Sequence, residues 1–335
     1  MERPTIVIAE IGVNHDGSYE KAVEMIHKAA EAGADYVKFQ TFRAERLVCA
    51  SADRADYQKE NCGGSESQLD MLRRYELTAE QFRQLAEECR RAGIGFLSSA
   101  FDLDSIDLLD SIGMDYWKIP SGEITNLPYL RKIAKPGRRV ILSTGMSTMD
   151  EIRKAVNLLA EGGVKREDIT ILHCNTQYPT QPADVNLRAM AALGELGCGA
   201  IGYSDHTVGI TVPVAAVALG ATMIEKHFTL DRTLAGPDHR ASADPDELRR
   251  MTAAIREVEL ALGSTEKRPT DSELPNRAVA RKSIVAATVI RRGEVLTEKN
   301  ITTKRPGTGL SPMLWDSVIG TCAIKDFQPD ELIEI

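Results

Sequence analysis

A short apolar run, a polar loop and an amphipathic helical segment follow one another repeatedly from Thr5 to about Leu262. Parallel strands need helix-length connections, so this alternation predicts a parallel sheet covered by helices. Eight such units fit a closed (β/α)₈ TIM barrel, and no G-x-G-x-x-G follows the first strand to favour an open dinucleotide-binding sheet. The predicted strands are Ile6–Glu10, Tyr36–Phe39, Ile94–Ser98, Tyr116–Ile119, Val140–Ser143, Thr170–His173, Ala200–Tyr203 and Thr222–Lys226.

Helix-capping residues support the same pattern. Thr78 and Gln81 form a predicted capping box, in which each side chain bonds the other residue's backbone amide. Ser147 and Asp150 are expected to play similar parts at the start of the helix that runs through Leu159. These start signals fall between predicted strands, as the alternating fold requires.

The pattern changes after the eighth unit. Lys267–Asn276 is polar and carries two prolines, which is typical of a linker. The sequence beyond it contains strand-like runs, Ser283–Val285 and Val318–Ala323, among several glycines. We therefore predict a barrel domain over residues 1–265, a linker over 266–280 and a small β-rich domain over 281–335.

Charge and cysteine usage narrow the function classes. A net charge of -8 and a pI near 5.4 argue against nucleic acid as a partner, because phosphate backbones attract basic surfaces. The longest apolar stretch, Val212–Ile224, is shorter than the roughly 18 residues that a membrane span needs. The six cysteines include no C-x-x-C pair, which indicates free thiols in a reducing compartment. We expect a cytoplasmic protein that binds neither nucleic acid nor membrane.

Polar side chains gather where the predicted strands end, which is where barrel enzymes bind their substrates. Lys38 and Lys118 end the second and fourth strands. A single strand-end lysine is more often paired with an acid or directed to solvent. Two lysines in one layer, with hydroxyls nearby, favour a small ligand that carries both a carboxylate and a phosphate.

His206 and His227 lie at the ends of the neighbouring seventh and eighth strands, close enough to share a metal ion. Neutral imidazole suits Mn²⁺, Zn²⁺ or Fe²⁺, and oxygen-rich surroundings without nearby thiolates favour Mn²⁺ or Mg²⁺. A structural, hydrogen-bonded role remains open for either histidine alone.

Glu10 and Glu123 are the carboxylates best placed for proton transfer. Ion pairs with Lys38 or Lys118 would look the same in the sequence. The segment from Phe42 to Leu77 is the least regular part of the predicted barrel. Irregular segments of that length inside a compact domain usually serve function.

Seven runs of sequence stand out along essentially the whole chain: Ala9–His15, Val37–Thr41, Lys118–Glu123, Ser204–Thr207, Glu225–Thr229, Gly236–Asp238 and, in the tail, Lys304–Gly307. In this order they resemble the sialic acid synthase family, which includes N-acetylneuraminate, legionaminate and pseudaminate synthases. Asn175–Pro179 looks closer to the legionaminate-type members, and Thr176 departs from the asparagine of some N-acetylneuraminate synthases.

The resemblance implies a TIM barrel followed by an antifreeze-like (SAF) domain, in a domain-swapped homodimer. It implies that phosphoenolpyruvate condenses with an N-acetylmannosamine-type aldehyde, with release of phosphate. The preferred metal would be Mn²⁺, with Mg²⁺ and Co²⁺ as alternatives, bound by His206 and His227. The residues implied for phosphoenolpyruvate are Lys38, Ser99, Lys118, Ser121 and Ser204. Those implied for the sugar are Glu10, Gln40, Tyr178, Asp238 and Arg305 of the other subunit, with Glu10 and Glu123 as catalytic carboxylates.

Two other functions use the same residues. A metal-dependent aldolase or hydrolase of a sugar phosphate would need the histidine pair and the lysines, but it would not consume phosphoenolpyruvate. A non-catalytic carbohydrate-binding protein would make the strand-end residues purely structural. Replacement of His206 or Glu123 by alanine would then leave its function intact.

Overall fold

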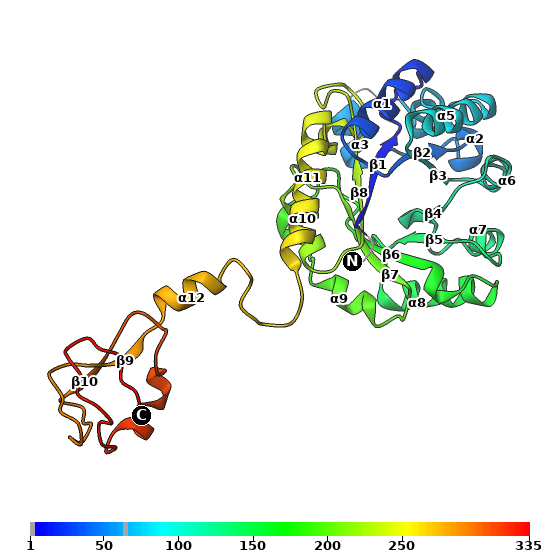
Figure 1. Ribbon diagram of the computed structural model, residues 1–335. Helices are drawn as coiled ribbons and strands as arrows, with labels where there is room; N and C mark the ends of the chain where they lie inside the picture. Colours follow the sequence, from blue (N-terminus) through cyan, green and yellow to red (C-terminus); the bar gives the residue numbers. More distant parts are fainter. Residues whose placement is uncertain (1–3, 63–65) are drawn as a thin grey trace. The chain divides into compact units, whose positions relative to one another are not determined.

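The computed structural model describes residues 4–62 and 66–335. Contacts divide the chain into two compact units, Met1–Gly263 and Ser264–Ile335. The first unit is a closed barrel of eight parallel strands in sequential order, with helices around its outside (Figure 1). The predicted (β/α)₈ fold is therefore confirmed. In the described part of the chain, no helix has the length and apolar character needed to cross a membrane.

The predicted barrel strands lie within two residues of the observed ones at both ends. The observed strands are β1 (Ile6–Gly12), β2 (Tyr36–Thr41), β3 (Gly95–Ala100), β4 (Trp117–Ile119), β5 (Val140–Ser143), β6 (Ile169–Cys174), β7 (Ala200–Asp205) and β8 (Met223–His227). The helices that surround the barrel are α1 (Tyr19–Glu31), α5 (Ala79–Ala92), α6 (Leu103–Ile112), α7 (Leu127–Ile133), α8 (Met149–Glu161), α9 (Ala189–Gly194), α10 (Thr211–Ala218) and α11 (Pro245–Leu262).

Alternation along the strands separates two apolar cores. One core packs the outward strand faces against the helices. The other fills the barrel interior with Ile8, Leu97, Ile141, Leu172 and Met223. Successive side chains on a strand point to opposite faces, so each residue two positions further on also points inward. The inward face therefore changes from apolar to polar toward the carboxyl ends of the strands, and this change creates the site.

Helix starts were predicted well in one case and poorly in another. The Thr78–Gln81 capping box before α5 is present. Before α8 the capping box is formed by Thr148 and Glu151, so the prediction for Ser147 and Asp150 was wrong by one residue. Thr148 is the residue whose extended backbone places its hydroxyl at the Glu151 amide, and sequence spacing alone does not show which of two adjacent hydroxyls does so.

The segment from Phe42 to Leu77 is not a plain loop. It contains three short helices, α2 (Ala44–Leu47), α3 (Asp56–Cys62) and α4 (Gln68–Arg73). Val13, Phe42, Met71 and Tyr75 form a small buried apolar cluster beneath them, with Leu47, Leu72 and Phe101 packed against it. This cluster fixes the segment over the carboxyl end of the barrel.

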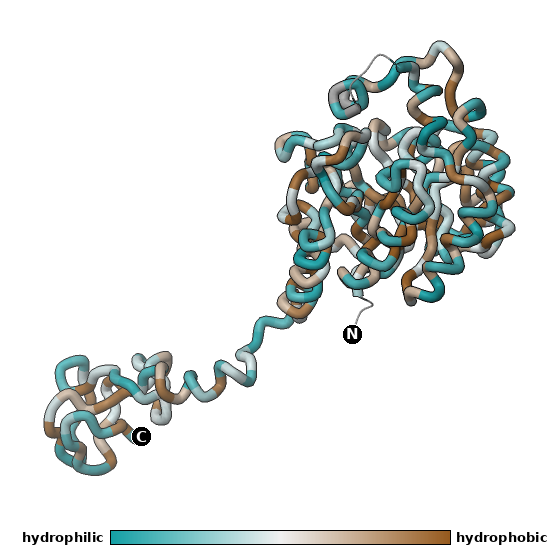
Figure 2. Tube along the Cα trace, turned by 90° about the horizontal axis from the view of Figure 1, so that it is seen from above, coloured by the Kyte–Doolittle hydropathy of each residue, from teal (hydrophilic) through white to brown (hydrophobic). Residues whose placement is uncertain are grey.

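The second unit has its own small core around Phe327, which is fully buried with Ile284, Ile290 and Leu296. Its antiparallel strands are β9 (Ser283–Ala286) and β10 (Ile301–Lys304). The predicted strand at Val318–Ala323 was wrong, since α13 (Trp315–Val318) ends there and Cys322 makes only an isolated bridge. Helix α12 (Leu274–Ala280) falls in the stretch predicted as a linker, and the preceding segment is largely hydrophilic (Figure 2).

We expect Phe327→Ala to destabilise the second unit by about 3–5 kcal/mol, because it leaves a cavity in a small core. Hydrogen exchange should show faster exchange in β9 and β10 and unchanged exchange in β1–β8. Val295→Ala in the same unit is the control: Val295 is 47% exposed, and its truncation should cost under about 0.5 kcal/mol. Equal loss of protection in both units would contradict two separate cores.

Candidate active site

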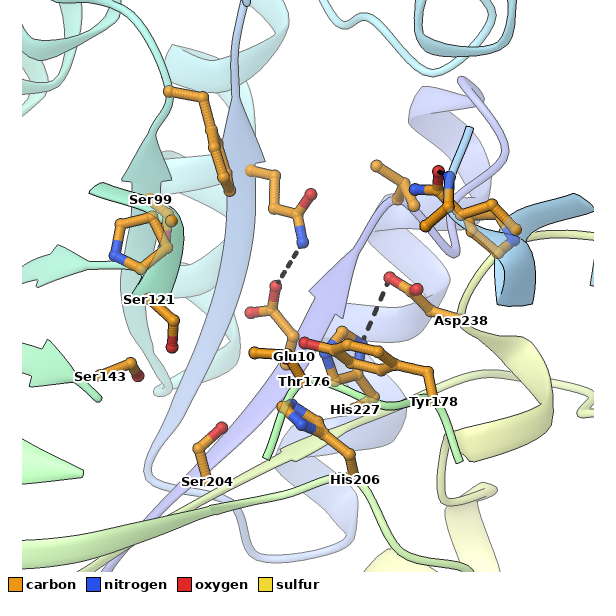
Figure 3. A pocket seen from close by; sticks show the side chains of 18 of the residues that line it. Glu10, Ser99, Ser121, Ser143, Thr176, Tyr178, Ser204, His206, His227 and Asp238 are labelled. Carbon is orange, nitrogen blue, oxygen red and sulfur yellow. Dashed lines mark hydrogen bonds and ion pairs between the residues drawn. The ribbon is translucent and has the colours of Figure 1, made fainter. Parts of the chain in front are cut away.

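A cavity of about 490 Å³ lies at the carboxyl ends of the barrel strands. It is lined by all twelve barrel residues that the sequence predicts for the site: Glu10, Lys38, Gln40, Ser99, Lys118, Ser121, Glu123, Tyr178, Ser204, His206, His227 and Asp238. Figure 3 shows many of these side chains converging from different strands and loops. Arg305 belongs to the second unit, where its Nε donates to the carbonyl oxygen of Ala280 at 3.0 Å.

Two lysines and two glutamates form the floor of this cavity: Lys38, Lys118, Glu10 and Glu225. Glu10 and Lys38 are parallel partners on β1 and β2, and their Oε2 and Nζ atoms lie 2.5 Å apart. Glu225 lies between the lysines, with Oε1 3.4 Å from Lys118 Nζ and Oε2 3.8 Å from Lys38 Nζ. All four side chains are buried, so the two positive charges depend on these carboxylates.

The two floor carboxylates differ in acidity. Burial raises the pKa of Glu10 to about 7, against the opposing effect of Lys38. Burial also disfavours the charged form of Glu225, but Lys118 and Lys38 outweigh it and lower the pKa of that carboxyl to about 2. Glu225 is therefore a fixed negative charge near neutral pH, whereas Glu10 can take up or release a proton.

Hydroxyl groups surround the lysines. Lys38 Nζ donates to Ser99 Oγ at 3.3 Å, and Ser204 Oγ donates to Glu225 Oε1 at 2.9 Å. Ser121 Oγ accepts a hydrogen bond from the amide of Gly145 at 2.9 Å. The predicted combination of lysines and serine hydroxyls is thus brought together in one cavity.

Glu123 lies away from the floor, in a short 3₁₀ turn (Ser121–Glu123) after β4. Asn126 Nδ2 donates to its Oε2 at 2.5 Å, which orients the carboxylate. Partial burial raises the pKa of Glu123 above its ordinary value. The expected alternative, an ion pair with Lys118, is not what holds Glu123, because Lys118 pairs with Glu225.

His206 and His227 lie side by side, with ring centroids 5.3 Å apart. His206 Nδ1 bonds the carbonyl oxygen of Asn175, which leaves Nε2 for another partner. His227 Nδ1 is buried without a hydrogen-bond partner among the described residues, and Asp238 Oδ2 is 3.5 Å from it. Burial lowers the pKa of His206 to about 4 and that of His227 well below its ordinary value, so both imidazoles are neutral.

Tyr178 completes this side of the cavity. Its ring centroid is 4.0 Å from that of His206 and 5.4 Å from that of His227. Asp238 is buried in the turn after β8, where burial raises its pKa to about 6. Without the family resemblance, the sequence of this turn predicts only an ordinary loop. The proximity of Asp238 to His227 is not evident from the sequence, because a loop separates the two residues.

Sequence reasoning left out several lining residues. Glu225 appeared in the sequence analysis only as the first residue of a matching run and was given no role, although it lies two residues before His227 and therefore on the same strand face. Ser143 lies two residues after Ile141, which faces the barrel interior, so Ser143 also points inward and lines the cavity. Thr176 lines the cavity itself, whereas Asn175 acts through its carbonyl oxygen on His206.

The segment containing α2–α4 supplies an apolar wall to the cavity. The apolar part of the wall comprises Leu47, Val48, Ala55, Met71, Leu72 and Tyr75, and the amides of Gln58 and Gln68 from the same segment also line the cavity. Asn61 of α3 donates to the carbonyl oxygen of Pro237 at 2.8 Å, which ties the segment to the turn that carries Asp238. The cavity therefore has a charged floor and an apolar wall, and it suits a ligand with an anionic end and a less polar end.

Comparisons with known proteins agree with this geometry. The model of the NeuB family matches residues 25–267, and that of the SAF domain matches residues 281–334. N,N'-diacetyllegionaminic acid synthase of Campylobacter jejuni is 47% identical over 99% of both chains. The protein of the same name from Legionella pneumophila is 44% identical over 94% of this chain and 89% of its own.

A solved structure also resembles this chain. The N-acetylneuraminic acid (sialic acid) synthetase of Leptospira borgpetersenii, in complex with citrate, has a TM-score of 0.71 and 34% identity. The match covers 82% of this chain and 90% of that one. The resemblance found in the sequence is confirmed: this chain belongs to the NeuB family, and its residues 281–334 form a SAF domain.

Proposed function

We propose that this protein is a phosphoenolpyruvate-dependent nonulosonate synthase, a transferase that joins phosphoenolpyruvate to an N-acetylmannosamine-type aldehyde and releases phosphate. The observation that carries the proposal is the floor of the cavity, where Lys38 and Lys118 flank one fixed carboxylate, Glu225. A small dianionic or trianionic ligand needs two cations in one confined place, and buried cations bind it more strongly than exposed ones. Membership of the NeuB family supports the same activity.

Phosphoenolpyruvate would lie on the floor. Lys38, Lys118 and the hydroxyls of Ser99, Ser121 and Ser204 would bind its phosphate and carboxylate. Protonation of Glu10, whose pKa of about 7 makes it available, would lower the negative charge of the floor as the anion enters. Glu10 would then hold a proton beside the reacting groups.

The sugar would extend from the floor toward the apolar wall. Gln40, Tyr178 and Asp238 offer hydrogen bonds for its hydroxyl and amide groups, and Gln40 Nε2 already donates to Glu10 Oε1 at 3.1 Å. The wall favours 2,4-diacetamido-2,4,6-trideoxymannose over N-acetylmannosamine, because the former carries a methyl group and an additional acetamido group. The 47% identity to an N,N'-diacetyllegionaminic acid synthase supports this choice.

The histidine pair fits a divalent metal, with Mn²⁺ preferred and Mg²⁺ or Co²⁺ as alternatives. Two neutral imidazoles lie with their ring centroids 5.3 Å apart, and the Asn175 carbonyl fixes the tautomer of His206. In residues 4–62 and 66–335, no group of three or more His, Cys, Asp or Glu is arranged for a metal, so the proposed site has two protein ligands. When bound, such an ion would supply Lewis acidity to the aldehyde oxygen.

The reaction would proceed by carbon–carbon bond formation followed by C–O cleavage. C3 of phosphoenolpyruvate attacks the aldehyde carbon, and the aldehyde oxygen gains a proton, which Glu10 would supply because its pKa is about 7. C2 becomes cationic, and the Glu123 carboxylate stabilises it and accepts a proton from the water that adds there. The resulting tetrahedral carbon expels phosphate and leaves the keto acid.

The second unit would act in a domain-swapped homodimer, in which Arg305 reaches the sugar bound by the other subunit. Arg305 is exposed in its own unit, where its Nε donates to the carbonyl oxygen of Ala280, and its two Nη groups would donate to a carbonyl or hydroxyl of the sugar. A cover from the partner would also exclude water from a cationic intermediate.

Phosphate release from phosphoenolpyruvate tests the activity itself. With Mn²⁺ present, we expect release with both sugars and a kcat/KM about tenfold or more higher for the trideoxy sugar, the range that a few apolar contacts give. A chelator should abolish release, and Mn²⁺ should restore it. Absence of release with either sugar, from folded protein, would favour a sugar-phosphate aldolase or hydrolase, or a carbohydrate-binding protein.

Glu123→Gln tests the cationic intermediate. The amide keeps the shape of the side chain but loses the charge, so kcat should fall by roughly 10²-fold or more. The KM for phosphoenolpyruvate should change little, because the charge of Glu123 acts on the cation that forms after the substrate has bound. Glu161→Gln, on the exposed end of α8, is the matched control and should leave both constants unchanged. A Glu123→Gln enzyme with normal kcat would remove Glu123 from the mechanism.

Arg305→Ala and Lys118→Met test the exchange of domains between subunits. Each homodimer should lose most of its activity. Co-expression with two affinity tags gives mixed dimers, in which one barrel has its own Lys118 and receives an intact Arg305 from the other chain. We expect one working site per mixed dimer. Mixed dimers as inactive as the parents would show that Arg305 serves its own barrel.

A further inference from the structure

Asp205 and Lys226 are two buried charges that the reaction above does not use. They are parallel partners on β7 and β8, and Lys226 Nζ lies 2.5 Å from Asp205 Oδ2. Both side chains are 0% exposed, and neither lines the cavity. Each residue stands directly before one of the histidines, since Asp205 precedes His206 and Lys226 precedes His227.

Hydrogen bonds connect this pair to the backbone around His206. Asp205 Oδ1 accepts from the amide of Thr207 at 3.2 Å and from its hydroxyl at 2.9 Å. A side-chain acceptor bound to the amide two residues on makes a turn, and His206 is the middle residue of this one. Lys226 Nζ also donates to the carbonyl oxygen of Thr207 at 2.8 Å. The residue next to His227 therefore holds the turn that contains His206.

Stability alone gives no reason for an ion pair here. Two charges lose their hydration on burial, and apolar residues of similar volume usually serve a core as well or better. Other strands of the barrel follow that rule at their outward positions, where Ile119, Leu142 and Ile171 are fully buried. The ion pair occurs between the two strands that carry the histidines.

We propose that the Asp205–Lys226 pair is a positioning device that fixes His206 and His227 relative to each other for metal binding. An ion pair with several directed bonds sets distance and orientation more narrowly than apolar packing does. The inference rests on the proposed metal site and deepens it, because it names residues that act on the metal only through its ligands.

The test is Mn²⁺ binding to the full chain, measured from loss of the free-ion EPR signal without substrates. The double variant Asp205→Leu with Lys226→Met removes both charges together, so it should fold, whereas either single change leaves an unpaired buried charge. We expect its Kd for Mn²⁺ to rise about tenfold or more, as removal of groups that orient metal ligands typically does. Thr207→Val keeps the ion pair but loses one bond to it, and we expect an intermediate rise.

Tyr129→Phe is the control. Its hydroxyl donates to the carbonyl oxygen of Ala100 at 2.8 Å, so the variant loses a buried hydrogen bond far from the β7–β8 pair. It should lower Tm and leave the Kd for Mn²⁺ unchanged.

The outcomes distinguish failure of the proposed metal site from failure of the positioning role of the Asp205–Lys226 pair. Wild-type protein that binds no Mn²⁺ would overturn the metal site, and the inference with it. Wild-type binding combined with an unchanged Kd in the folded double variant would overturn the positioning role alone. If the double variant does not fold, an unchanged Kd in Thr207→Val overturns it instead.

Discussion

Charge pairing on the floor of the barrel is the constraint on which the site depends. Lys38 and Lys118 could not stay charged in a buried interior without Glu10 and Glu225, because an unpaired buried cation costs several kcal/mol. These four residues come from β1, β2, β4 and β8, so the pairing requires the barrel to close between its first and last strands. The barrel must therefore close before the charges of the two lysines and the two glutamates can balance, and these paired residues form the floor of the cavity.

The sequence was sufficient for features that depend on local periodicity. Strand positions, the Thr78 capping box and the inward-facing strand-end residues all follow from spacing. An ion pair of Glu10 with Lys38 was foreseen as an alternative role and is present. Glu225, however, was not recognised as the partner of both lysines, because a partner 187 residues from Lys38 and 107 from Lys118 is chosen by barrel closure. The strand expected at Val318–Ala323 failed for a related reason. Small domains with few long-range pairs give weak strand periodicity, and a short helix competes for the same residues.

The residues of the apolar wall, unlike those of the floor, are not recognisable as site residues from the sequence. Met71 and Tyr75 look like ordinary core residues at helical spacing, and both are buried in a small cluster. They line the cavity because the segment from Phe42 to Leu77 is anchored over the barrel, partly through Asn61 and Pro237. No motif marks such residues. A wall that differs among relatives while the floor stays the same would let one chemistry serve several sugars.

The distribution of unsatisfied polar atoms separates reactive from supporting residues. In the described part of the chain, Ser143 Oγ, Glu225 Oε2 and His227 Nδ1 are buried without a hydrogen-bond partner and belong to residues that line the cavity, whereas Glu10 Oε2 is paired with Lys38 Nζ at 2.5 Å. Buried polar groups without partners are costly, so they persist where a ligand completes them. Asp205, behind the cavity, instead bonds Lys226, Tyr203 and Thr207. One layer of the barrel is left incomplete for substrates, and the layer behind it is saturated with bonds that hold the first in place.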